Sequence, residues 1–236
     1  MSCFFDIAYF ERFALSVEKA MPRLWNAVLI LFAILGIPAS IFPATSDEPG
    51  KPEAIQIEHA TATFQVGTNM PGLLVKGKSE AVQARVQIRR SADGLTLDHV
   101  SAQVPVKTLA TGIALRDQHM RERIFTTSDG QIPDVTFDAE GVSCPRVVAG
   151  REANCKVSGT LSIRGVPRNF SVSLKIREAG GSTPAFRAAG EGTVKLSEYG
   201  IEQPTQFGVK TENEIQLHFD FPETPATALD TRAGRQ

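Results

Sequence analysis

The densest group of side chains that could do chemistry lies in residues 116–123, which read RDQHMRER. Asp117 and His119 form the best acid–base pair in the chain, because a carboxylate beside an imidazole can support proton transfer. Their places on adjacent turns of one short helix orient them poorly for a shared substrate. We therefore interpret His119 first as a helix residue that is hydrogen-bonded to a neighbouring strand or loop.

Other catalytic patterns are missing from the sequence. It contains no G-x-S-x-G, no G-x-x-x-x-G-K-[ST] and no H-E-x-x-H. The histidines His59, His99, His119 and His218 are scattered singly, whereas a zinc site needs several ligands to converge. We predict a protein without catalytic residues, metal or cofactor, and an enzyme that uses Asp117 and His119 stays the weaker hypothesis.

The elements around this group read almost entirely as strands with a period of two. The clearest are KVSGTLSI (156–163), FSVSLKI (170–176) and EIQLHFDF (214–221), in which apolar and other residues alternate. About eight such strands without regular helices between them favour an antiparallel meander. Closing this meander into a barrel removes its exposed edges.

Two local features refine this prediction. In GLTLDHVSAQVPV (94–106) the apolar positions change parity near Asp98 and His99, which indicates a β-bulge. Residues 111–125 contain the only convincing helical stretch, with Asp117 and Arg121 in the favourable order four residues apart. We expect a short helix that covers one mouth of the barrel.

The interior of an eight-stranded barrel can either fill with side chains or hold one slender ligand. Gly159, Gly190 and Gly192 fall on the apolar face, where they either leave room for a ligand or only relieve curvature. Parity gives the candidates for lining a tunnel. They are Phe64, Val66, Val104, Val106, Val135, Phe137, Leu161, Phe170, Val172, Val194, Leu217 and Phe219.

The first 44 residues differ from the rest. Basic residues precede an uncharged apolar run at 24–37, and small residues and prolines follow it, which is the layout of a secretory signal. The run is shorter than the roughly 18–20 residues that span a bilayer. We predict a signal peptide or membrane anchor over 1–44, a linker over 45–56, a barrel domain over 57–221 and a disordered tail over 222–236.

The cysteines fit export. Cys144 and Cys155 both follow the predicted signal and flank the polar stretch PRVVAGREAN, so they could face each other across a long hairpin. We predict a disulfide between them, with two free thiols at strand ends as the alternative. The net charge of −1 gives no reason to expect nucleic acid as a partner.

Four stretches together resemble the YceI-like family of polyisoprenoid-binding proteins over about residues 52–221. These are, in the family's order, TLATGIALRDQHMRERIF, IPDVTFDAEGV, VSGTLSIRGVPRNFSVSLKI and GTVKLSEYGI. The resemblance implies an all-β fold, an antiparallel lipocalin-like barrel of about eight strands with one short helix, whose interior holds a long isoprenoid chain. It also implies export to the periplasm and no defined catalytic activity.

The early strand departs from the family, because ATFQVGTNMPGLLVKGKSEAVQARV lacks the histidine of the pattern F-x-V-x-H. The barrel could therefore bind another lipid, a quinone or nothing. We predict an exported lipid-binding protein, a carrier or stress-related factor, with Arg116 and His119 as candidates for a head-group contact. The alternative is a non-catalytic barrel that docks onto a membrane or redox partner.

The expected location is the periplasm or the outside of the cell, with tethering to the inner membrane as an option. The N-terminal segment would then provide contact with the inner membrane. Pairing of two copies of the chain into a homodimer is a further option for its assembly.

Overall fold

The computed structural model describes residues 50–92, 94–180 and 182–229. The predicted signal or anchor and the first part of the predicted linker lie outside the described residues. Within the described part, no helix has the length and the apolar character that a membrane crossing would need.

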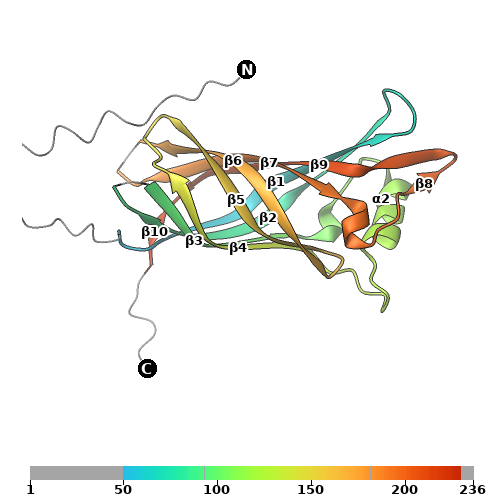
Figure 1. The fold of residues 1–236 in the computed structure, drawn as a ribbon, viewed down its shortest axis with the longest axis horizontal. Helices are drawn as coiled ribbons and strands as arrows, with labels where there is room; N and C mark the ends of the chain where they lie inside the picture. Colours follow the sequence, from blue (N-terminus) through green and yellow to red (C-terminus); the bar gives the residue numbers. More distant parts are fainter. Residues whose placement is uncertain (1–49, 93, 181, 230–236) are drawn as a thin grey trace, which may run out of the picture. The chain divides into compact units, whose positions relative to one another are not determined.

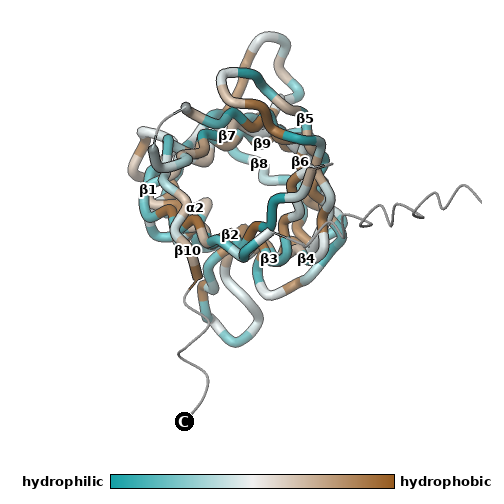
Figure 2. Tube along the Cα trace, turned by 90° about the vertical axis from the view of Figure 1, so that its left-hand side faces the viewer, coloured by the Kyte–Doolittle hydropathy of each residue, from teal (hydrophilic) through white to brown (hydrophobic). Residues whose placement is uncertain are grey.

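The described residues form a closed antiparallel β-barrel (Figure 1). Pairing of the first long strand with the last closes the ring, as the view along the barrel shows (Figure 2). The predicted barrel of about eight strands is confirmed. The long strands are β1 (Glu53–Thr68), β2 (Leu74–Arg90), β3 (Gly94–Val104), β4 (Val135–Pro145), β5 (Glu152–Ile163), β6 (Val166–Ala179), β7 (Ala185–Lys195) and β9 (Val209–Pro225).

The strands alternate between an inward apolar face and an outward polar face. On β2, for example, Val82, Ala84 and Ile88 are buried, and the residues between them are more exposed. The β-bulge predicted near Asp98 is present, because Leu97 pairs with Ile88 while His99 already pairs with Gln87. The extra residue restores the inward face of β3 after the change of parity.

One end of the barrel is covered by short helical segments, and we call it the helical end. The segments are η1 (Val106–Thr108), the α-helix α2 (Ala114–Met120) and the π-helix η2 (Arg121–Phe125). Figure 1 shows α2 at this end, together with the short strand β8 (Thr205–Gln206). The helix predicted within residues 111–125 is therefore present, and it lies at a mouth of the barrel as expected.

The opposite end is formed by the start of β1 and the ends of β2, β6 and β9, and it corrects two predicted boundaries. β1 begins at Glu53, inside the predicted linker, because Ile55 and Ile57 face the core and are buried. The first part of the predicted disordered tail, residues 222–229, continues β9 to Pro225 and then forms β10 (Thr227–Ala228), which pairs with the start of β1. This pairing, together with the burial of Ala226, orders the chain to residue 229. The rest of the predicted tail lies outside the described residues.

β4 and β5 form a seam in the barrel wall. Their paired residues are limited to Thr136–Asp138 on β4 and Thr160–Ser162 on β5. Farther along the same two strands, Cys144 and Cys155 form a disulfide, with their Cα atoms 5.1 Å apart. The disulfide therefore joins the two strands where backbone pairing between them has ended.

Candidate ligand-binding cavity

The barrel encloses a long apolar cavity of about 250 Å³. All eight long strands contribute lining residues, from Ile88 and Phe186 toward the opposite end to Met120 and Phe125 at the helical end. No charged side chain is among the lining residues. The volume is just below the roughly 300–1,000 Å³ of ordinary small-molecule pockets, and it is distributed along the barrel, so it suits a slender chain.

Ten of the twelve predicted tunnel residues line this cavity. The two others do not. Val66 is buried near the helical end of β1, between Val75 and Ile215. Val106 follows Pro105 into η1, where the alternation of a strand no longer applies. It is fully buried in a separate small cluster with Leu109, Met120 and Phe125. Contact of the ten lining residues with a ligand stays a prediction.

The helical end supplies lining residues that strand parity does not identify. Met120, Ile124 and Phe125 all face the cavity. Met120 and Ile124 are four residues apart, so helical spacing was the signal that could have found them. These side chains form an apolar floor at the helical end.

Tyr199, in the 3-10 helix η3 (Leu196–Tyr199), also lines the cavity and was missed. Burial raises the pKa of its phenol, and the neighbouring charge of Glu198 raises it further, against a smaller opposing effect of Arg168. The phenol is thus kept neutral at ordinary pH, and Tyr199 is one of three lining residues with a polar side chain, together with Thr63 and Thr136.

The three inward glycines do not widen the cavity, so that interpretation was wrong. A Cβ atom at Gly192 would collide with the ring of Phe170, and one at Gly190 would collide with Leu174. A Cβ atom at Gly159 would strike the backbone oxygen of Asp138. The glycines make room for neighbouring protein groups.

The motif RDQHMRER fixes the loop that precedes it. The buried carboxylate of Asp117 accepts hydrogen bonds from the Thr111 backbone N–H at 2.7 Å and from the Thr111 hydroxyl. Arg116 donates to the Thr111 hydroxyl at 2.8 Å and to its carbonyl oxygen at 2.9 Å. Ala110 in turn pairs with Lys78 of β2, so the motif connects α2 to the barrel wall.

The electrostatics of Asp117 agree with a structural role. Burial raises the pKa of this carboxyl, but the hydrogen bonds from Thr111 and the charges of Arg121 and Arg116 outweigh burial. The pKa is lower than its usual value, and the carboxylate stays charged near neutral pH. A carboxylate engaged in this way is a poor proton acceptor for His119.

The two head-group candidates lie outside the cavity lining. Arg116 uses its guanidinium on Thr111, as described above. His119 is half-buried, and its Nδ1 atom is buried without a hydrogen-bond partner. The described residues also contain no group of three or more His, Cys, Asp or Glu side chains that could hold a metal ion.

A closed antiparallel barrel around an apolar cavity defines a lipocalin-like barrel. The model of the YceI-like domain matches residues 54–222. This match covers most of the 236 residues, and the chain belongs to the YceI-like family. The resemblance predicted from the four sequence stretches is confirmed. No curated protein matches the chain.

Several solved structures are similar to this chain. The YceI protein of Campylobacter jejuni has a TM-score of 0.51 and 18% identity, covering 69% of this chain and 90% of that chain. A polyisoprenoid-binding domain from Saccharophagus degradans, implicated in plant cell wall breakdown, has a TM-score of 0.49 and 15% identity, covering 75% and 98%. BcnA of Burkholderia cenocepacia has a TM-score of 0.49 and 17% sequence identity, and the match covers 69% of this chain and 94% of that chain. At 18% identity, the similarity to the Campylobacter protein shows a shared fold and nothing more.

Proposed function

We propose that this protein is exported and holds an isoprenoid-type or quinone-like lipid inside its barrel, as a carrier or stress-related factor. The observation that carries the proposal is the apolar cavity along the barrel, whose lining includes no charged side chain. An apolar space lined by residues of all eight long strands favours a hydrocarbon chain over a compact polar metabolite. The name of the Saccharophagus degradans domain mentions polyisoprenoid binding for that protein.

The energetics of burial support a lipid as the ligand. Each isoprene unit has five carbons, and each buried CH₂-sized group contributes about 0.8 kcal/mol. A few units therefore give a large gross stabilisation, from which the cost of immobilising the chain is subtracted. An apolar ligand also restores the dispersion contacts that wall side chains lose when they face an empty space.

Export to the periplasm, or beyond the cell, is part of the same proposal. It is supported by the basic and apolar layout of residues 1–44 and by the disulfide between Cys144 and Cys155, since stable disulfides belong to oxidising compartments. We also propose that the N-terminal segment contacts the inner membrane and that the protein assembles as a homodimer. The alternative, a barrel that only docks onto a membrane or redox partner, needs no interior space, so the cavity favours lipid binding.

A pair of neighbouring alanines on β7 tests the proposal. Ala188 lines the cavity, whereas Ala189 is exposed on the outer face. Protein purified without detergent from its own host should carry a lipid that native mass spectrometry detects. Ala188→Phe should reduce the lipid occupancy at least about tenfold, because the ring occupies the space of the ligand.

Ala189→Phe is the matched control and should retain the lipid. Thermal unfolding of both variants checks that the barrel is intact. Wild-type protein that emerges from its host with no lipid would contradict the proposed function, and so would equal lipid content in the two variants.

A further inference from the structure

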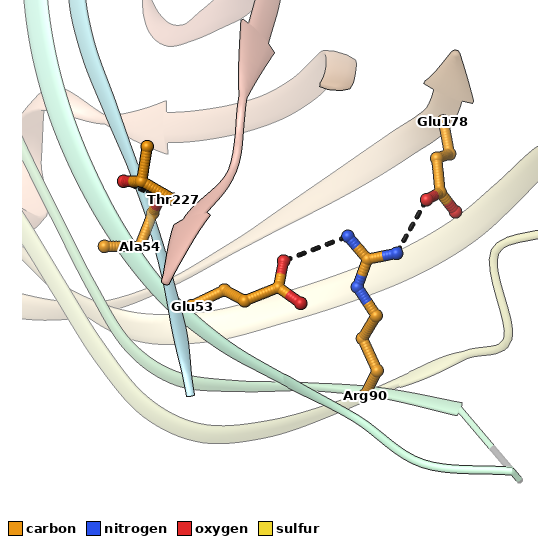
Figure 3. A network of polar contacts seen from close by, with 5 residues as sticks. All are labelled: Glu53, Ala54, Arg90, Glu178 and Thr227. Atoms are coloured by element: carbon orange, nitrogen blue, oxygen red, sulfur yellow. Dashed lines mark hydrogen bonds and ion pairs between the residues drawn. The ribbon is translucent and has the colours of Figure 1, made fainter. Parts of the chain in front are cut away.

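Three charged side chains lie together at the end of the barrel opposite α2. Arg90, the last residue of β2, donates from Nη2 to Oε2 of Glu53 at 3.0 Å and from Nη1 to Oε1 of Glu178 at 2.7 Å (Figure 3). Glu53 is the first residue of β1, and Glu178 is close to the end of β6. We call Glu53, Arg90 and Glu178 the charged cluster.

The charged cluster lies on the inward face, one layer beyond the cavity. On each of the three strands, the charged residue is two positions away from an isoleucine that lines the cavity. These isoleucines are Ile55, Ile88 and Ile176. Because strand residues two apart share a face, the three charged side chains continue the inward layers. The Arg90 guanidinium also lies over the ring of Phe186, 4.9 Å from its centre, and Phe186 lines the cavity.

The cluster spans the mouth from one wall to the other. In the ring of long strands, β2 and β6 are separated by β3, β4 and β5 on one side and by β1, β9 and β7 on the other. The ion pair between Arg90 and Glu178 therefore joins opposite walls. The side chains of Glu53, Arg90 and Glu178 are 23%, 32% and 15% exposed, so the cluster is shielded from solvent but still reachable.

The charges of the cluster do not balance, because one guanidinium faces two carboxylates. Both terminal nitrogens of Arg90 already have a carboxylate partner, while its Nε atom is buried without any partner. A phosphate at this mouth would therefore face a cluster with one net negative charge. An uncharged oxygen, by contrast, meets no like charge and can accept a hydrogen bond from the guanidinium, which still has unused N–H donors that include the buried Nε–H.

We propose that the charged cluster closes this end of the cavity and selects lipids whose polar end is an uncharged hydroxyl or carbonyl, excluding prenyl phosphates. This rests on the proposed function, and it assigns the polar end of the lipid to Glu53, Arg90 and Glu178. The apolar chain then extends toward the floor formed by Met120, Ile124 and Phe125.

The test compares two probes of equal chain length on delipidated protein, geranylgeraniol and geranylgeranyl monophosphate. The wild-type barrel should bind the alcohol at least about tenfold more tightly than the phosphate, since the cluster repels the anion. The double variant Glu53→Gln, Glu178→Gln changes the cluster from one net negative charge to one net positive charge. Its affinity for the phosphate should rise about tenfold or more, while that for the alcohol changes less than about threefold.

Asp220→Asn provides the matched control. Asp220 pairs with Arg187 at 3.2 Å, and both side chains are exposed on the outer face, so this change removes one carboxylate from an arginine without touching the interior. It should leave both affinities unchanged, whereas the single variant Glu178→Gln should already shift the preference toward the phosphate. Thermal unfolding of each variant verifies the fold.

The outcomes separate the two proposals. A wild-type barrel that binds both probes equally, with the same ratio in the double variant, overturns the selectivity site and leaves lipid binding in place. A wild-type barrel that binds neither probe overturns lipid binding as well. A preference for the phosphate in the wild type contradicts the charge argument directly.

Discussion

Phe207 occupies a backbone conformation that a bulky residue rarely adopts. Its φ is +50°, and its side chain is 96% exposed. It forms, with Gly208, the two-residue turn between β8 and β9, in which Gln206 pairs with Val209. Positive φ at both turn residues is the pattern for which Asn-Gly is preferred, because asparagine tolerates the left-handed region better than an aromatic residue.

Phe207→Asn should therefore stabilise the protein. The exposed ring loses almost no packing, and relief of the backbone should raise the free energy of unfolding by about 0.5–1 kcal/mol. Urea unfolding of wild type and variant measures the difference. Phe207→Ala removes the same ring without this relief, so a gain of equal size in the alanine variant would contradict the backbone explanation.

Parity alone could place individual wall residues, because the side of a strand is fixed by counting. It therefore found Phe137, Phe170 and eight other lining residues, and it failed at Val106, where the strand has ended, and at Val66. It could not show what fills the space above a glycine. Gly192 of β7 lies under the ring of Phe170 of β6. Only the fold brings these two residues together.

The charged cluster was also beyond sequence reasoning. Parity places Arg90 on the same face as Ile88. It does not show that the carboxylate of Glu178, 88 positions later in the sequence, will contact Arg90. An arginine at the end of a strand is usually solvated. Recognising Arg90 as an interior residue requires knowing that Glu178 lies on the opposite wall.

Among the elements, the β4–β5 seam depends most on a covalent bond. Backbone pairing between the two strands is confined to a few residues, and the disulfide lies beyond it with a sequence separation of 11. A cross-link that closes a loop of this length contributes roughly 2–3 kcal/mol by restricting the unfolded chain.

The double variant Cys144→Ser, Cys155→Ser should lower the free energy of unfolding by about 2–3 kcal/mol. Denaturant unfolding gives the value, and wild-type protein kept in reductant should lose a similar amount. Hydrogen exchange should increase first in β4 and β5 near the two positions, because few backbone pairs remain there. Unchanged stability of the variant would show that the seam holds without the disulfide.

The elements were predictable where a local pattern defines them. The bulge at Asp98 follows from a change of parity, and the helix within 111–125 follows from its spacing and composition. The strand ends were not predictable, because they depend on distant partners. Residues 227–228 look like a polar tail, yet they pair with Glu53 and Ala54 of β1.

At the scale of the whole molecule, the closed wall and the hollow interior have opposite effects on stability. Closure gives every long strand a paired neighbour on both sides, over a short stretch only at the β4–β5 seam, and so removes most of the exposed edges. The cavity, in contrast, leaves wall side chains without contacts on one side, so an empty barrel forgoes part of the stabilisation that a filled core would have. A ligand that fills the cavity and does not bind the unfolded chain should therefore stabilise the whole barrel cooperatively.

Lipid-loaded protein should consequently melt at a higher temperature than the same protein after delipidation. A free ligand at about 100 times its dissociation constant adds about 2.7 kcal/mol to the free energy of unfolding. For a chain of this size, each kcal/mol raises the melting temperature by roughly 2–4 °C, which gives an expected difference of about 5–10 °C. Differential scanning calorimetry on matched loaded and delipidated samples measures it.

Ala188→Phe distinguishes occupancy of the cavity from any other effect of the lipid. The ring fills part of the space that the ligand would use, so the variant should melt at the same temperature before and after delipidation. Ala189→Phe, on the outer face, should keep the full difference between the two samples. If the inward variant shifted as much as the wild type, the stabilising lipid would be bound outside the cavity, and the hollow of the barrel would not be the site that this fold provides.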